Sequence, residues 1–305
     1  MRRTFASTLA ELAVDDERIL LLTGDLGYMA LEPFSDRFPR RFINVGVAEQ
    51  NMVGMATGLA EAGFVPFCYS IATFASLRAY EMIRNGPIAH DLPVRIVGVG
   101  GGFEYGHNGL SHYPLEDVGL MRIQPGMTVI APADFEQARA AVLATWDNPG
   151  PVYYRLGKDD TTKVAGLDGR FETERVQLIR PGSDVLLLTM GTAAIDGLGA
   201  AERLQEAGIE AAVAVVATLS PPPTDDLVRL MSGYPLAATV EAHYVNGGLG
   251  SLVAETIAEA GLSCRLLRCG VRTTPDGHSG SQGYLHGLHG ISAEQVGTQI
   301  AAALS

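Results

Sequence analysis

The sequence predicts an α/β protein built from two doubly wound domains. Apolar, strand-like runs alternate with helical patterns along almost the whole chain, which is typical of parallel sheets covered by helices on both faces. One polar, glycine-bearing stretch, "KDDTTKVAGLDGRFETE" at 158–174, interrupts this alternation. With 305 residues, the chain is long enough for two domains that each bury a core. We therefore expect a first domain at 1–165, a linker at 166–180 and a second domain at 181–305.

Each half of the chain supplies its own strands and helices. In the first half, buried strands are expected at 18–23, 64–70, 94–100, 127–132 and 150–157, and helices at 3–14, 49–62, 73–86 and 134–146. In the second half, strands are expected at 184–191, 210–219, 235–242 and 264–270, and helices at 193–207, 224–232, 249–260 and 293–304. Ligands of such open sheets bind at the carboxyl ends of the strands, so the functional residues are expected there.

Composition excludes several classes of function. The net charge of −12 makes nucleic-acid binding and attraction to an anionic membrane unfavourable. No apolar run approaches the roughly 20 residues that span a bilayer. The three cysteines, Cys68, Cys264 and Cys269, form no CxxC pair. We therefore expect free thiols and a cytoplasmic location.

A single acid stands out in "RFINVGVAEQNMVGMATGLAEAG" (41–63), where Glu49 opens a helix. An acid in the first turn stabilises a helix through its dipole by about 0.3–1 kcal/mol, which is one explanation. The helix also carries Gly54, Gly58 and Ala62 four residues apart, a face that a cofactor or another helix can approach closely. A carboxyl group beside such a contact is desolvated, which raises its pKa and suits a proton-sharing group. The residues alone leave both explanations open.

The same segment resembles the pyrimidine-binding segment of thiamine-diphosphate enzymes of the transketolase type. It most resembles the smaller, C-terminal subunit of transketolases that are made as two chains. Further stretches agree in the same order along nearly the whole chain: "LLTGDLG" (21–27), "TFASLRAYEMIRN" (73–85), "LEDVGLMRIQPGMTVIAPAD" (115–134), "GPVYYRLGK" (150–158) and "VEAHYVNGGLGSLVAE" (240–255). In that family the glutamate hydrogen-bonds a ring nitrogen of the cofactor's aminopyrimidine, which allows the thiazolium carbon to lose its proton. The resemblance implies that Glu49 has this catalytic role.

The resemblance also implies a set of cofactor-binding residues. Phe74, otherwise an ordinary core aromatic, would stack on the aminopyrimidine. Asp25, otherwise a helix cap, would lie near the thiazolium and the subunit contact. Arg78 is either a solvated helix charge or a charge near the site. Ile71 stands where many relatives carry a further aromatic, so one pyrimidine contact is expected to be aliphatic here or to be supplied from elsewhere.

The loop "GGGFEYGHNGLSHYP" (100–114) is either a plain flexible connection or a loop that binds the substrate, and the resemblance implies the second. His112 matches a family histidine that contacts the donor's hydroxyls and assists proton transfer. The family usually reads "EDGxTHQ" where this chain reads "HNGLSHY", so His107 replaces a glutamate and Asn108 replaces an aspartate that reads a substrate hydroxyl. Gly100 stands where transketolases often carry another active-site histidine. These departures leave the identity of the substrate open.

Two arginines are expected to bind the donor's phosphate. Arg155 ends a strand in "YYRLG"; it is either a surface ion-pair partner or, by the resemblance, a bidentate phosphate ligand. Arg2 is expected to contribute from the N-terminal helix. His243 and the glycines after it are expected to be structural.

The sequence lacks the family's metal-binding motif, and no metal ligand is expected on this chain. Relatives hold Mg²⁺ and the diphosphate with a "GDG" run followed by an asparagine, and hard oxygen ligands suit that cation. Here "GDL" at 24–26 lacks the second glycine, and "PDG" at 275–277 has no suitable asparagine after it. We therefore expect a larger, diphosphate-binding partner subunit in an α₂β₂ heterotetramer, with the small-residue helix at 49–62 as part of the contact.

The leading hypothesis is a transketolase subunit that helps to transfer a two-carbon ketol unit from a ketose phosphate to an aldehyde. A second hypothesis is an E1-β subunit of a 2-oxo-acid dehydrogenase, which passes an acyl unit to a lipoyl domain. A hybrid would pass the two-carbon unit to a carrier protein. "VGVAEQNMVG" and Arg155 favour transketolase over E1. The joint presence of Glu49, Phe74, Asp25 and His112 argues against an inactive regulatory subunit.

Overall fold

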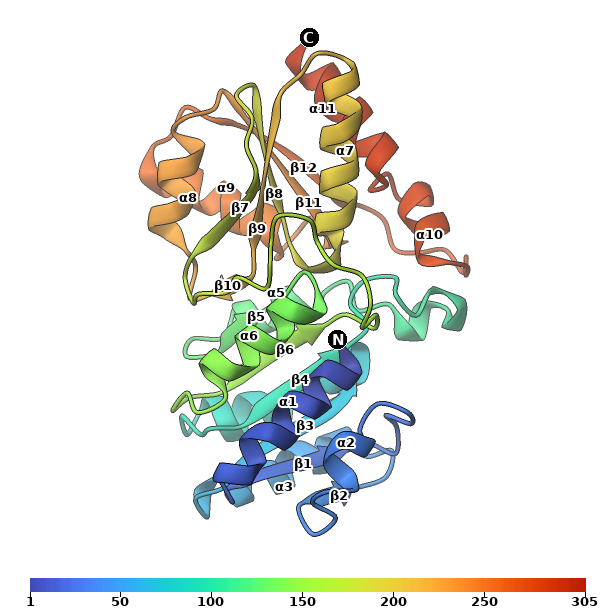
Figure 1. Cartoon of the computed structure of the whole chain (residues 1–305), viewed down its shortest axis with the longest axis vertical. Coiled ribbons are helices and arrows are strands. Elements are labelled where there is room, and N and C mark those ends of the chain that lie inside the picture. The colour runs from blue at the N-terminus through green and yellow to red at the C-terminus, as the bar shows by residue number, and fades with distance from the viewer.

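The computed structural model describes residues 1–305 and has two α/β units, one above the other in Figure 1. The first sheet has the strand order β10 (Thr218–Ser220), β5 (Thr128–Ile130), β6 (Val152–Leu156), β4 (Arg95–Val99), β3 (Val65–Ile71), β1 (Ile19–Thr23) and β2 (Phe42–Asn44). The second has the order β12 (Arg265–Val271), β11 (Leu236–Tyr244), β8 (Val185–Thr189), β9 (Ala211–Val216) and β7 (Val176–Arg180). Only the edge strands β10 and β7 run antiparallel to their neighbours. The predicted α/β fold is confirmed.

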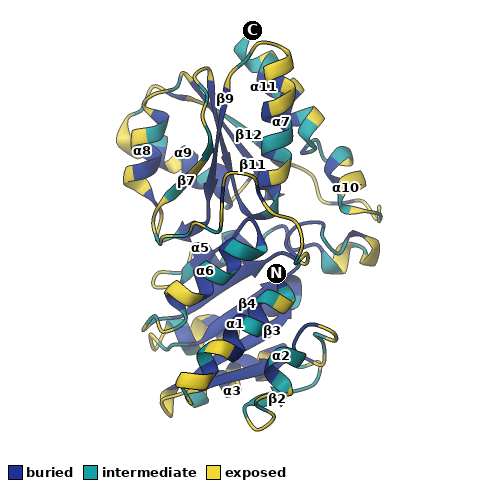
Figure 2. Ribbon diagram, viewed as in Figure 1, coloured by how far each residue is buried: buried dark blue, intermediate teal, exposed yellow.

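Helices cover both faces of each sheet. Around the first sheet lie α1 (Arg2–Asp15), α2 (Glu32–Ser35), α3 (Glu49–Glu61), α4 (Tyr80–Ile83), α5 (Asp117–Arg122) and α6 (Phe135–Thr145). Around the second lie α7 (Ala194–Glu206), α8 (Thr224–Met231), α9 (Leu249–Ala260), α10 (Gln282–Leu288) and α11 (Ala293–Leu304). Side chains of β1 alternate between the faces: Ile19 and Leu21 join a cluster with α1 and α6, whereas Leu20 and Leu22 join one with α3. Because both faces are covered, the central strands are buried throughout (Figure 2) and read as continuous apolar runs.

The two units share one apolar core. A cluster of 32 buried residues contains side chains from both sheets, among them Val129 of β5 and Leu188 of β8. The second half of the chain also donates β10 to the first sheet, where Thr218 pairs with Ile130 of β5. In α5, Arg122 donates a 3.2 Å hydrogen bond to the carbonyl of Gly247. The carboxyl edge of the first sheet is therefore held in place by the second unit.

Several elements differ from the expected ones. The helix expected at 73–86 is broken into a π-helical turn at Phe74–Arg78, the short α4 and a second π-helical turn at Arg84–Ile88. Pro87 has no N–H to continue the regular pattern. Residues 176–180 of the expected linker form β7, whose partly exposed edge position gives no clear apolar signal. The helices α2, α5 and α10 were not expected, and the domain boundaries themselves stay predictions.

All three cysteines are free and buried, as expected. No helix has both the length and the apolar character needed to cross a bilayer.

Candidate active site

Glu49 lies at the start of α3, beside the carboxyl ends of β1 and β3. Its side chain is only 1% exposed. Ser70 at the end of β3 donates a 2.9 Å hydrogen bond to Oε1, and Arg78 forms a 2.7 Å ion pair with Oε2. Gly24 follows β1, and a Cβ there would lie 3.2 Å from Oε1, so glycine leaves room for the carboxylate. Ser70 is a partner of Glu49 that the sequence did not indicate.

The surroundings of Glu49 fit a flat, hydrogen-bonding ring. Each carboxylate oxygen can accept about two hydrogen bonds and uses one here, so acceptor capacity remains for a ring nitrogen. The Arg78 guanidinium lies 4.5 Å from the centroid of the Phe74 ring and covers the carboxylate. Since Arg78 is 40% exposed, its side chain has solvent into which it can move. Phe74 and Glu49 then offer an apolar face and an acceptor, which suits an aminopyrimidine.

His112 lies beside Phe74, so that Glu49, Arg78, Phe74 and His112 form one row of side chains in contact. The two ring centroids are 5.1 Å apart in an edge-to-face arrangement. Ser111 Oγ is 2.9 Å from Nδ1 of His112. Partial burial lowers the pKa of His112, because desolvation disfavours the imidazolium. The neutral ring can accept a proton or a hydrogen bond from a hydroxyl group.

Asp25 is exposed at the carboxyl end of β1, next to Gly24. Its backbone N–H donates to Asn44 Oδ1 at 3.1 Å, and Asn44 Nδ2 donates to Asp25 Oδ1 at 2.9 Å. This reciprocal pair holds Asp25 in a left-handed conformation with φ of +60°, which is uncommon outside glycine. The carboxylate is therefore held at the edge of the site, although it does not bond to Glu49.

His107 and Asn108 lie on an exposed 3₁₀ turn of the predicted substrate loop, and their side chains form no hydrogen bonds within the protein. The second unit contacts this turn, because the backbone N–H of Gly280 donates a 3.1 Å hydrogen bond to the carbonyl of Gly106. Tyr113 Oη donates to the carbonyls of Gly106, at 2.6 Å, and His278, at 3.0 Å. The loop is thus anchored while two of its predicted substrate-binding side chains stay free.

Arg155 does not fit the predicted role of a bidentate phosphate ligand. It is 5% exposed, and its Nε binds Asp117 at 2.9 Å. Its Nη2 donates to the carbonyls of Pro114 and Ala242, at 2.9 and 3.0 Å. The guanidinium also fills the space beside Gly101, where a Cβ would lie 2.8 Å from Cζ. Arg155 therefore supports both ends of the substrate loop and joins it to the second unit.

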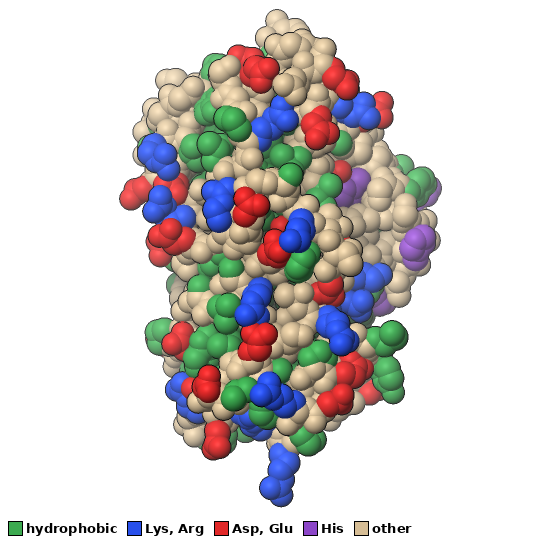
Figure 3. Space-filling model, in the orientation of Figure 1, with side chains coloured by type: hydrophobic (Ala, Val, Ile, Leu, Met, Phe, Trp, Pro, Cys, Tyr) green, Lys and Arg blue, Asp and Glu red, His purple; other side chains and the backbone are tan.

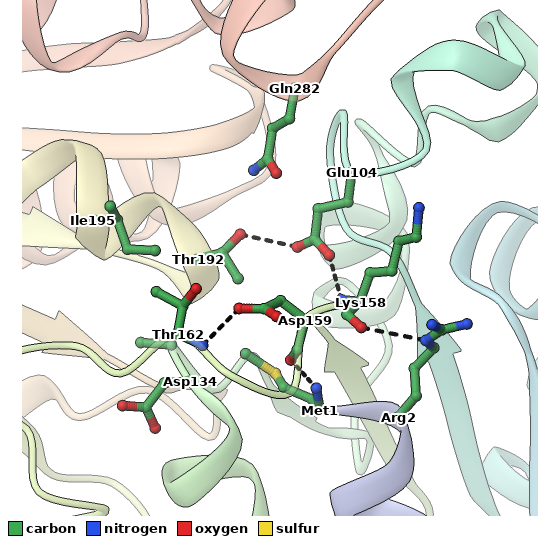
Figure 4. A pocket seen from close by; sticks show the side chains of 11 residues that line it. Met1, Arg2, Glu104, Asp134, Lys158, Asp159, Thr162, Thr192, Ile195 and Gln282 are labelled. Carbon is green, nitrogen blue, oxygen red and sulfur yellow. Dashed lines mark hydrogen bonds between the residues drawn. The ribbon is translucent and has the colours of Figure 1, made fainter. Parts of the chain in front are cut away.

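Arg2 lines a cleft of about 390 Å³ between the two units (Figure 4). Its Nε donates to the Lys158 carbonyl at 3.2 Å. The acids of this cleft are already hydrogen-bonded: Glu104 accepts from Thr192 Oγ1 at 2.9 Å, and Asp159 accepts from Thr162 N at 2.7 Å. In Figure 4 the charged ends of Arg2 and Lys158 both point away from these acids, toward the first unit.

Tyr105 is a residue of the site that the sequence did not indicate. Its ring centroid is 6.2 Å from that of His112, and the Lys158 ammonium lies 4.9 Å from it on another side. The contacts from Glu49 through Arg78, Phe74 and His112 therefore continue to Tyr105 and Lys158. The Tyr105 ring fills the space that a side chain at position 100 would need. The glycine at that position was the only local sign of this arrangement in the sequence.

Charges on the face seen in Figure 3 are mixed, with Lys and Arg placed among Asp and Glu. No basic patch of the kind that binds nucleic acids is visible on this face.

Comparisons with known proteins agree with this geometry. Residues 1–163 match the family described as "Transketolase, pyrimidine binding domain", and residues 174–296 match "Transketolase, C-terminal domain". The chain is 37% identical over 303 residues to a putative transketolase C-terminal section of Methanocaldococcus jannaschii, covering 98% of this chain and 95% of that one. It is also 37% identical over 297 residues to a 6-deoxy-6-sulfo-D-fructose transketolase subunit of a Clostridium species, covering 97% and 92%.

A solved structure, described as a split gene transketolase in an inactive beta4 tetramer, superimposes with a TM-score of 0.90 at 36% identity, covering 99% of this chain and 97% of that chain. The chain therefore belongs to the transketolase family and is the subunit of a split transketolase that carries the pyrimidine-binding and C-terminal domains.

Proposed function

We propose that this transketolase subunit helps to move a two-carbon ketol unit from a ketose phosphate to an aldehyde acceptor. The row of Glu49, Arg78, Phe74 and His112 at the carboxyl edge of the first sheet is the observation that carries this proposal. It combines a buried carboxylate, an aromatic face and a neutral imidazole within one continuous set of contacts. Asp25, His107 and Asn108 border it.

Each residue has a defined task in this reaction. Glu49 accepts a hydrogen bond from the aminopyrimidine ring, and Phe74 packs on its face. His112 accepts a proton from a donor hydroxyl as the carbon–carbon bond breaks. When bound, thiamine diphosphate supplies a nucleophilic carbon and an acceptor for the electron pair that cleavage releases. Asn108 and His107 are placed to select among donor hydroxyls.

The other half of the site belongs to a larger subunit. The sequence carries no motif that holds Mg²⁺ and the diphosphate, so we place both on that subunit in an α₂β₂ assembly in the cytoplasm. The inactive state named for the 36% identical beta4 tetramer supports the inference that this chain needs a partner. Gly54 and Gly58 on the exposed face of α3 have nothing within 4 Å of a Cβ and offer a surface for close contact.

The donor's terminal group is anionic, as a phosphate or a sulfonate. The relative from Clostridium is named for a sulfonated fructose. A sulfonate carries a negative charge and accepts hydrogen bonds as a phosphate does, so either group fits this inference. Arg2 supports this inference because it is a cation without a carboxylate partner that borders the substrate loop.

A coupled assay tests the proposed function. The chain is co-expressed with its larger subunit and supplied with thiamine diphosphate, Mg²⁺ and xylulose 5-phosphate. Glu49→Ala is expected to lower donor cleavage by about 10²–10⁴-fold, the usual contribution of a positioned acid–base group. Glu61→Ala, at the exposed end of the same helix, is the matched control. Cofactor-bound enzyme that cleaves 2-oxo acids but no ketose would refute the proposal and favour acyl transfer to a lipoyl or carrier protein.

A further inference from the structure

Phe103 joins the substrate loop to the second unit. Its side chain is completely buried, although the loop to which it belongs has an exposed tip. It shares a cluster of seven buried residues with Leu285 of α10 and with Ile291, which lies between α10 and α11. α10 lies next to the loop (Figure 1), and a Cβ built on Gly106 would come within 2.7 Å of Leu285 Cδ1. The base of the loop is therefore packed closely against the second unit.

His289, the residue directly after α10, covers one face of the Phe103 ring. The two ring centroids are 4.9 Å apart, and the ring planes differ by only 10°. His286 meets the same phenyl ring edge to face, with centroids 6.2 Å apart. Tyr113, from the other end of the loop, does so at 5.2 Å. Phe103 thus contacts three rings, and two of them belong to the second unit.

The two histidines are placed for packing more than for hydrogen bonding. Nδ1 of His286 lies 3.0 Å from Asp196 Oδ2 on α7, which fixes the orientation of that ring. Nε2 of His286 and Nε2 of His289 are both buried without a hydrogen-bond partner. An imidazolium at position 289 would bring an Nε2–H into this setting without an acceptor, which is costly. The stack on Phe103 therefore favours a neutral His289.

The charged groups around His289 do not reverse this preference. Burial lowers the pKa of His289, and His278 and His286 lower it further, while Asp276 opposes the shift. The Asp276 side chain is 76% exposed, so water screens its charge. Asp196 is already engaged with His286, and the neighbour from the substrate loop is the uncharged Phe103 ring. The imidazole at position 289 is consequently neutral while the loop lies against the second unit.

His112 is carried by the same loop, between Phe103 and Tyr113. Both of these flanking rings are buried in the cluster that includes residues of the second unit. The contact of His112 with Phe74, at a centroid distance of 5.1 Å, depends on where they place the loop. A small displacement of a positioned group lowers the rate of the reaction that it assists.

We propose that His289 is a positioning residue, which holds the substrate loop through Phe103 and thereby places His112 against Phe74. Where it concerns donor cleavage, this inference rests on the proposed function. The hold on the loop itself needs no donor and is measurable in the full chain alone. When the stack on Phe103 is lost, the loop leaves the second unit more often, and His112 leaves its position with it.

Amide hydrogen exchange of the full chain measures the hold on the loop. In His289→Ala, the backbone amides of residues 103–113 are expected to exchange about 2–10-fold faster at pH 7.5, the effect of losing one aromatic pair. In His289→Phe they are expected to exchange as in wild type, because the phenyl ring keeps the stack and Nε2 has no hydrogen bond to lose. His90→Ala, at an exposed histidine, is the matched control. Unchanged exchange of the β8 amides shows that each variant is folded.

Acid pH is expected to loosen the loop in wild type but not in His289→Phe. Below pH 6.5, the ordinary pKa of the group, the ring of an opened loop takes up a proton before the packed ring does, and this favours opening. At equal pH, the ratio of loop exchange in wild type to that in His289→Phe is therefore expected to rise severalfold between pH 7.5 and 5.5. A ratio that stays constant would overturn the role of the neutral stack.

Kinetics of the complete enzyme with xylulose 5-phosphate test the effect on His112. In His289→Ala, kcat/KM for the donor is expected to fall about 2–10-fold while the affinity for thiamine diphosphate stays unchanged, and His289→Phe is expected to restore kcat/KM. Unchanged loop exchange in His289→Ala would overturn the hold on the loop. Faster exchange with wild-type kcat/KM would overturn the positioning of His112. If cofactor-bound wild type cleaves no ketose, the proposed function fails, and loop exchange still decides whether His289 holds the loop.

Discussion

Arg155 and Asp117 form an ion pair that is almost entirely removed from water, with side chains 5% and 0% exposed. Tyr153 Oη donates a 2.6 Å hydrogen bond to the same carboxylate. Two buried charges are tolerated because each is paired and hydrogen-bonded, so removing one partner leaves the other without compensation. The pair therefore stabilises the junction beneath the substrate loop.

Arg155→Met is expected to reduce the free energy of unfolding by about 3–5 kcal/mol, because Asp117 would stay buried without a cation. Urea denaturation followed by circular dichroism measures the change. The control is Arg139→Met, whose ion pair with Glu11 is exposed on both sides and is worth less than about 1 kcal/mol. Similar losses in the two variants would contradict the assigned role of Arg155.

Glu241 and His243 are fully buried neighbours on β11 with opposite titration behaviour. Burial raises the pKa of Glu241 from 4.5 to about 7, and hydrogen bonds from Gly250 and Leu249 oppose the rise. Burial also lowers the pKa of His243 from 6.5 to about 4. Both groups thus favour their neutral forms in the folded protein.

The two shifts give pH dependences of opposite sign. Between pH 4.5 and about 7 the unfolded chain releases the Glu241 proton first, so this group makes stability fall as pH rises. Between about 4 and 6.5 the unfolded chain protonates His243 first, so that group makes stability fall as pH decreases. The contributions of these two groups to stability therefore oppose each other between about pH 4.5 and 6.5.

Single variants separate these slopes. Relative to wild type, the free energy of unfolding of His243→Asn is expected to decrease as pH rises from 4.5 to 7, whereas that of Glu241→Gln is expected to increase. Urea titrations at several pH values give the sign, whatever the absolute loss of stability. Parallel profiles in the two variants would show that these groups do not titrate as described.

The sequence singled out Glu49, Phe74 and His112 because each lies in a segment whose local pattern resembles the family, and the structure brings these side chains together. It could not locate Tyr105, because the position of that ring depends on the left-handed backbone of Gly100 and on the fold of the loop between them. The sequence also assigned Arg155 to substrate binding. Its position at a strand end does not reveal that the guanidinium is already paired with Asp117 in the folded protein.

At the scale of elements, apolar periodicity predicted the central strands well because each is buried on both faces. The edge strand β7 escaped notice because an exposed edge has no such pattern. The apolar periodicity of residues 73–86 also gave no sign that the expected helix is interrupted. Its first π-helical turn, Phe74–Arg78, carries two residues of the site, and such turns are frequent at functional sites.

The exposed face of α3 gives an element-scale prediction. Gly54→Ala and Gly54→Leu are both expected to raise the stability of the isolated chain by up to about 1 kcal/mol, because glycine is a poor helix former. Gly54→Leu is also expected to weaken binding to the larger subunit, since its side chain blocks close approach. Sedimentation of the mixed subunits measures this, with Gly54→Ala as the small-side-chain control. Unchanged binding of the leucine variant would exclude this face from the contact.

At the scale of the whole molecule, the shared core of 32 residues predicts that both units unfold together. Trp146 is the only tryptophan and lies at the end of α6 in the first unit, so its fluorescence reports on that unit alone. Far-ultraviolet circular dichroism reports on both units. The two probes are expected to give the same urea midpoint.

Leu219→Ala sharpens this prediction. Leu219 is completely buried in the shared core, on the strand that joins the units. Its truncation is expected to cost about 2–5 kcal/mol and to move both midpoints by the same amount. A shift confined to the dichroism signal would mean that the units unfold separately.

The pairing of β10 with β5 also bears on how the chain is made. Thr218 follows Ile130 by roughly 90 residues in the chain. At ordinary rates of translation, Ile130 therefore leaves the ribosome about 5–20 s before Thr218. During that time the outer edge of β5 has no partner, and an open strand edge is a template for pairing with another chain. Neighbouring nascent chains on one messenger RNA are therefore exposed to one another through this edge, and a chain released at residue 165 would keep it open permanently.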